Sequence, residues 1–236
     1  MCESGELVAH SAQCVYRHAL FVSYLAYRGA VDGEKNPKAA ELAAKIPNLF
    51  KQDWIKGLSI EAVEQRFVDT PFGSLSVGQR TEAGWLVEGM VVLAWAVGMA
   101  DLPPFYSKVN GAKVSAALGI FRPDPDERIR KAALRDENEI LMGARACDAV
   151  LWRLSQYLLD PKPMEFYKRL MDSEGRHLTI DGLEFLDGDL AVDGKPLSAV
   201  PINDLREIGS ITYDRNRRFR WLLGLEDGLA TLTTVN

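Results

Sequence analysis

The sequence predicts a mainly α-helical fold, a single-domain helical bundle with a small β-meander near residues 177–200. Apolar residues recur at three- and four-residue intervals over four long segments, one of which is apolar on nearly every side. Asp-Gly dipeptides at 181, 187 and 193 alternate with short apolar runs, which is the strongest local indication of hairpins. No repeat or linker separates two folding units, so we expect one domain over residues 1–236.

The N-terminal segments are expected to be helical. A long, largely buried helix should cover residues 7–31 and end at the Asp-Gly turn at 32–33. Pro37 suits the first turn of a second helix, which Pro47 should kink or break. Ser59 is the expected N-cap of a short third helix that ends near residue 69.

The segment 77–99 predicts the central helix of the domain. Trp85, Glu88 and Trp95 repeat at helical spacing along it, and the flanking positions are apolar as well. A helix that is hydrophobic nearly all round lies inside a domain. Further helices are expected over 126–159, 164–171 and 211–225.

Composition excludes several classes of protein. The 236 residues carry 28 basic and 33 acidic side chains, and a net charge of −5 argues against general binding of nucleic acid or of anionic membranes. The longest apolar stretch, 84–100, is too short for a membrane span and contains Glu88. Three cysteines without a CxxC pair indicate reduced thiols, so we expect a cytoplasmic protein without a disulfide framework.

Two groups of residues suggest a metal site, and each has a simpler explanation. His10, Cys14 and His18 share one helical face, but zinc needs a fourth ligand, and buried cysteine commonly behaves as a small hydrophobe. The meander acids Asp181, Asp187, Asp189 and Asp193 do not fit the calcium-loop pattern and are explained by turn chemistry. We therefore expect neither a metal nor a cofactor.

The most informative residues are carboxylates on apolar stripes. Glu88 and Asp148 should either stay neutral or meet a cation. Arg215 and Arg218 share one face of the last helix and are the natural partners, while Arg217 and Arg220 share another face. Competing candidates are Arg28, Arg145 and Arg153. The predicted polar cluster is completed by tryptophans and comprises Glu88, Asp148, Arg215, Arg218, Trp85, Trp95 and Trp221.

This cluster has two interpretations. It is either a structural network that joins helices or the polar floor of a ligand pocket. The chain contains no GxSxG, HExxH, Walker or GxGxxG motif. The sequence therefore leaves the function unknown and favours a non-catalytic protein that contacts other proteins. The alternative is a small-molecule-binding protein or a hydrolase-type enzyme that uses the cluster. The oligomeric state stays open.

Several segments resemble a known family. They are Trp85-x-x-Glu88, the run 93–98 (Leu-Ala-Trp-Ala-Val-Gly) followed by Asp101-Leu-Pro, the long helix with Ile140, Asp148 and Trp152, the run 189–195 and the run 213–224. Their order is similar to that in the bacterial family called domain of unknown function 4272, over most of the chain from about residue 14. The resemblance implies no activity and no catalytic residues. It implies that Trp85, Glu88, Trp95, Arg215 and Trp221 belong to one shared feature, and Phe219 stands where that pattern has a small residue.

Overall fold

The computed structural model describes residues 8–32, 41, 45, 54–55, 57–58, 60–122, 125–172 and 182–225. The cap Ser59, the residues His177 and Asp181, and nearly all of the helix expected after Pro37 lie outside these ranges. The predicted fold class is confirmed, because the described residues form mainly α-helices and one small antiparallel sheet. None of the helices within these ranges has the length and apolar character of a membrane span.

The chain forms two compact units, each made of separate stretches of sequence. The α1–α6 unit comprises His10–Leu102 and Val109–Arg135. The α7–α9 unit comprises Met1–Ala9, Pro103–Lys108 and Asp136–Asn236. That residues 1–236 form a single domain stays a prediction.

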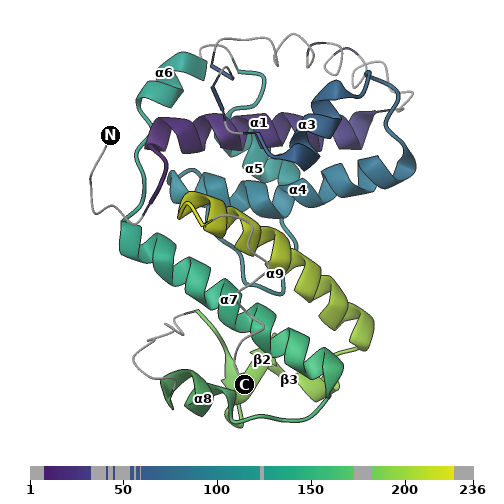
Figure 1. The fold of residues 1–236 in the computed structure, drawn as a ribbon, viewed down its shortest axis with the longest axis vertical. Helices are drawn as coiled ribbons and strands as arrows, with labels where there is room; N and C mark the ends of the chain where they lie inside the picture. The colour runs from purple at the N-terminus through teal and green to yellow at the C-terminus, as the bar shows by residue number, and fades with distance from the viewer. Residues whose placement is uncertain are drawn as a thin grey trace. The chain divides into compact units, whose positions relative to one another are not determined.

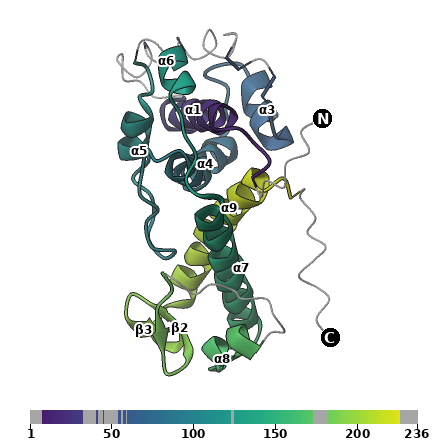
Figure 2. The same cartoon turned by 90° about the vertical axis from the view of Figure 1, so that its left-hand side faces the viewer.

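In the α1–α6 unit, two long helices lie side by side (Figures 1 and 2): α1 (Ala12–Val31) and α4 (Val77–Ala96). They approach closely where a Cβ on Gly29 would lie 2.4 Å from the Cβ of Ala83. Helix α1 begins at Ala12, whereas the sequence predicted a start at residue 7. The start is fixed by the N-cap Ser11, whose side chain accepts a hydrogen bond from the Cys14 amide. The shorter helices are α3 (Ala62–Asp69), α5 (Gly111–Leu118) and α6 (Pro125–Arg130).

The prediction of one continuous helix over 126–159 is wrong. Helix α6 ends at Arg130, and α7 (Glu137–Leu159) begins after a non-helical connection. Within the α1–α6 unit the Arg135 amide donates to the carbonyl of Ala96 at 2.8 Å, which removes it from any helix. Asp136 then caps α7 by accepting from the amide of Asn138. A backbone partner distant in sequence therefore interrupts the periodic pattern.

In the α7–α9 unit, α7 and α9 (Ile202–Leu222) run side by side in opposite directions (Figure 1). The connection between them contains α8 (Phe166–Asp172) and strands β1 (Phe185–Leu186), β2 (Asp189–Val192) and β3 (Lys195–Pro196), followed by the 3-10 helix Leu197–Ala199. The strands pair antiparallel in the order β1-β2-β3, with Phe185 opposite Leu190 and Ala191 opposite Pro196.

The predicted hairpin turns at 187 and 193 are confirmed. Asp187 and Asp193 have φ values of 51° and 52°, and the glycine after each is also at positive φ. These are the left-handed conformations that a two-residue turn of this kind requires. Helix α9, in contrast, begins at Ile202 rather than at 211. The additional turns bury only Leu205 and Ile208 among polar neighbours, so the apolar pattern there was too sparse to indicate a helix.

Candidate functional site

Glu88 is almost fully buried in α4, with 2% of its surface exposed. Its Oε1 accepts a hydrogen bond from the backbone amide of Val109 at 2.9 Å. Val109 directly precedes Asn110, the N-cap of α5. A Cβ on Gly111 would lie 2.8 Å from Cγ1 of Val87, so α5 begins in close contact with α4. Through this contact, Glu88 positions the start of α5.

Arg215 is buried in α9 and holds a loop of its own unit. Its Nη1 donates to the carbonyl oxygens of Pro103 and Pro104 at 3.0 and 2.9 Å, and its Nη2 donates to that of Ser107 at 2.6 Å. Arg218 is equally buried, whereas Arg217 and Arg220 are half-exposed. The two faces of α9 that carry these arginine pairs therefore differ in burial.

Asp148 is half-buried in α7. Its Oδ1 accepts from Nδ2 of Asn216 in α9 at 2.7 Å. Burial raises the pKa of the Asp148 carboxyl, while the hydrogen bond from Asn216 and the charge of Arg220 oppose that rise. The preceding residue, Cys147, is fully buried, and burial raises the pKa of its thiol to about 12. The thiol therefore stays protonated and is a poor nucleophile at neutral pH.

The members of the predicted cluster belong to both units. Trp85, Glu88 and Trp95 are in the α1–α6 unit, and Asp148, Arg215, Arg218 and Trp221 are in the α7–α9 unit. Helices α7 and α9 pack together and bring Asp148 to Asn216, while Arg215 contacts the 103–107 loop. All three tryptophans are half-buried. One common site for the seven residues stays a prediction.

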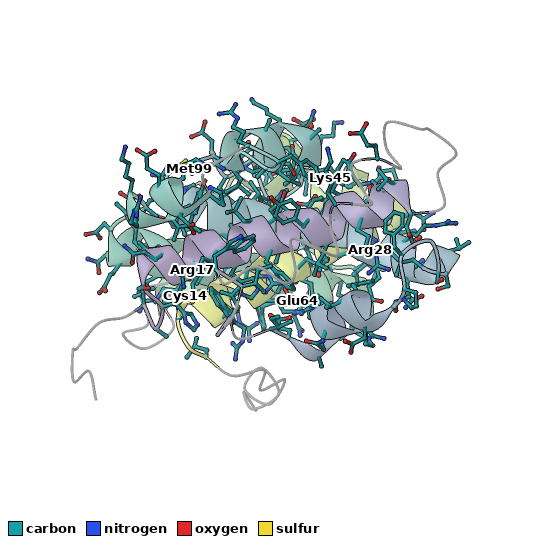
Figure 3. The ribbon with its side chains drawn as sticks, turned by 90° about the horizontal axis from the view of Figure 1, so that it is seen from above. Cys14, Arg17, Arg28, Lys45, Glu64 and Met99 are labelled. Atoms are coloured by element: carbon teal, nitrogen blue, oxygen red, sulfur yellow. The ribbon has the colours of Figure 1, made fainter. Side chains whose placement is uncertain are left out.

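Arg28, one of the competing arginines, binds backbone carbonyls within the α1–α6 unit. Its guanidinium donates to the carbonyl oxygen of Phe67 and, at 2.6 and 2.8 Å, to those of Thr70 and Pro71. One turn later, the carboxylate of Asp32 accepts from the amides of Gly73 and Leu75. Arg28 in the last turn of α1 and Asp32 at its C-cap thus fix the connection from α3 to α4. Figure 3 shows Arg28 on α1 with Glu64 of α3 to one side of the helix.

Arg153, another competitor, forms a buried ion pair with Asp189. Its Nε lies 2.6 Å from Oδ1 and its Nη2 lies 2.5 Å from Oδ2 of Asp189. The same carboxylate accepts from the amides of Met164 and Leu190. The assignment of Asp189 to turn chemistry is therefore wrong. Asp189 begins a fully buried strand, and that position was the only indication that its carboxylate needed a partner.

His18, a member of the suspected metal group, contacts a carboxylate. Its Nε2 lies 3.0 Å from Oε1 of Glu64, and both side chains are completely buried. Glu64 also accepts from the amide of Glu61 and so helps to cap α3. Cys14 is half-buried, and burial raises its pKa against the charge of Arg17. Over the described part of the chain, no three His, Cys, Asp or Glu side chains are grouped so that they could hold a metal ion.

Three helices of the α1–α6 unit each have an arginine bound to the carbonyls at or near their C-terminus, which the sequence did not indicate. Arg28 binds carbonyls at the end of α3, and Arg128 binds those of Leu118 and Gly119 at the end of α5, at 3.1 and 2.9 Å. Arg135 donates from Nε to the Trp95 carbonyl near the end of α4, at 2.7 Å, with its guanidinium over the Trp95 ring. The last carbonyls of a helix lack internal partners and carry partial negative charge, which a guanidinium satisfies.

The fold and these contacts define a mainly helical protein in which buried charged side chains bind backbone amides and carbonyls at helix ends and in loops. The chain belongs to the family described as Domain of unknown function (DUF4272), whose family model matches residues 1–167. The match covers the α1–α6 unit and α7. The segments 189–195 and 213–224, on which the resemblance also depended, lie outside it. No curated protein and no solved structure matches the chain.

Proposed function

We propose that this chain is a non-catalytic protein of the bacterial cytoplasm that acts by binding another protein. The observation that carries the proposal is the environment of Arg215. Its buried guanidinium donates to three backbone carbonyls of the 103–107 loop, so its hydrogen-bonding capacity serves the fold. A catalytic arginine, in contrast, directs its donors at a place where substrate charge develops.

The other buried charges support the same conclusion. Glu88 binds a backbone amide, Arg28 binds three backbone carbonyls, and Arg153 is paired with Asp189. Buried charged side chains that form ion pairs or cap helices stabilise a fold and need not belong to an active site. Cytoplasmic location is supported by Cys14 and Cys147, which are not disulfide-bonded.

A small-molecule site is the second candidate, and one observation favours it. Asp148 is half-exposed, its carboxyl pKa is raised, and Asn216 orients it through Oδ1. A carboxyl with these properties is suited to general acid–base work or to binding a hydrogen-bond acceptor when protonated. Asp148→Asn would remove this chemistry while retaining the acceptor for Asn216.

Native mass spectrometry of the tagged chain, purified gently from its own cells, separates the two candidates. The proposal predicts a species whose mass is that of the tagged chain (26.2 kDa plus the tag) and a second polypeptide, and the same species with Asp148→Asn. A species carrying a few hundred extra daltons that disappears with Asp148→Asn would contradict the proposal and support the small-molecule site.

A further inference from the structure

The connection between α5 and α6 contains an aromatic residue, Phe121, whose backbone conformation is strained. Phe121 has φ of 61°, in the left-handed region, which costs a bulky residue about 1–2 kcal/mol. Asparagine or glycine would adopt this conformation more easily. Phe121 is only half-buried, so its ring does not recover this energy by complete packing. Strain of this kind is typical of positions that contact a ligand or partner.

The surroundings of Phe121 fix its ring in place. The Tyr27 ring lies edge-on at 5.0 Å between centroids, and the Tyr24 ring lies at 5.3 Å. On the backbone side, Arg128 donates to the carbonyls of Gly119 and Arg122 on either side of Phe121. The ring is therefore held by α1 and the adjoining backbone by Arg128 of α6, so a partner would meet a preorganised surface.

Phe121 lies in the most basic segment of the α1–α6 unit. Residues 109–135 contain six basic side chains (Lys113, Arg122, Arg128, Arg130, Lys131 and Arg135) and three acidic ones (Asp124, Asp126 and Glu127). They are thus net positive in a chain whose net charge is −5. Arg122 follows Phe121 directly and is exposed. Its guanidinium can bind a carboxylate through two hydrogen bonds, which also makes arginine frequent among residues that dominate binding.

We infer that Tyr27, Phe121 and Arg122 form a docking surface for an acidic protein segment that carries an aromatic side chain. The inference rests on the proposed function and names its partner class. The rings accept the aromatic group by edge or offset stacking, and Arg122 binds a neighbouring carboxylate. Nucleic acid is a poorer match, because its binding depends on several phosphate contacts made by cationic side chains, whereas this surface contributes one arginine, Arg122.

A random copolymer of glutamate and tyrosine is a direct probe of this surface. Fluorescence anisotropy of the labelled copolymer should show saturable binding to the full chain and weaker binding of poly-glutamate. Arg122→Glu should weaken binding about tenfold or more. The matched control is Lys113→Glu, which makes the same charge change at an exposed position in the first turn of α5, outside the proposed surface, and should have little effect. Phe121→Asn should also weaken binding about tenfold. Its melting temperature should stay close to that of wild type, because relief of the strain at positive φ offsets the lost ring contacts with Tyr24 and Tyr27.

Several outcomes would overturn the inference. Equal effects of Arg122→Glu and Lys113→Glu would indicate bulk charge alone, and equal binding of poly-glutamate would exclude a role for the rings. Single-stranded DNA that displaces the copolymer at lower concentration would make nucleic acid the partner. If native mass spectrometry finds a polypeptide whose binding Arg122→Glu and Phe121→Asn leave unchanged, the proposed function stands and only this surface is wrong.

Discussion

Replacing Arg215 by lysine tests whether the buried guanidinium holds the 103–107 loop. Lysine retains the positive charge but has a single nitrogen. In the native structure two guanidinium nitrogens reach three carbonyls, those of Pro103, Pro104 and Ser107, at 2.6–3.0 Å. One ammonium group cannot reach all three positions, so at least one carbonyl loses its charged donor. Each hydrogen bond from a charged donor contributes about 1.5–3 kcal/mol.

We therefore expect Arg215→Lys to lower the free energy of unfolding by about 2–4 kcal/mol. For a chain of this length, that corresponds to a melting temperature lower by roughly 5–15 °C. Urea titration followed by circular dichroism measures the free energy, and a thermal scan measures the temperature. Arg206→Lys, at an exposed position of the same helix, is the matched control and should change stability by less than about 0.5 kcal/mol. Equal stabilities of Arg215→Lys and Arg206→Lys would refute the reasoning.

Three further changes test other contacts, each by the same urea titration. Asp189→Asn should cost about 3–5 kcal/mol, because it leaves the charge of Arg153 buried without its carboxylate, and a change below 1 kcal/mol would show that the pair is dispensable. Gly119→Ala should cost clearly more than Gly194→Ala: both have positive φ, at 72° and 68°, but only a Cβ on Gly119 would collide with Arg128. The raised pKa of Asp148 means that the folded protein binds that proton more tightly than the unfolded chain does, so ionisation destabilises the fold as pH rises above about 4. Relative to wild type, Asp148→Asn should therefore gain stability from about pH 4 to pH 7, and an opposite trend would contradict the assigned direction.

Local chemistry could be predicted from the sequence, and the hairpins are the clearest example. Asp187 and Asp193 each precede a glycine, and that dipeptide alone specifies a turn with positive φ at both positions. The central helix was equally predictable, since α4 is apolar on nearly all sides and buries Glu88 as expected. Both features depend on neighbouring residues only.

The partners of the buried charges could not be predicted, because most are backbone groups. Arg28 and Arg215 bind carbonyls, which every residue carries and no sequence pattern distinguishes. Arg153 and Asp189 are side-chain partners, but 36 residues separate them and neither lies on a pattern that indicates the other. The sequence thus identified charged residues that needed partners, whereas tertiary structure determined which groups satisfied them.

The free energy of unfolding of Glu88→Gln tests most directly the claim that the buried charges serve the fold. The amide is isosteric and neutral, and it weakens the acceptor that holds the Val109 amide at the start of α5. The structural interpretation predicts a loss of at least about 1–2 kcal/mol relative to wild type. An unchanged or higher stability would contradict it, since groups that are held ready for a ligand generally destabilise the unliganded fold.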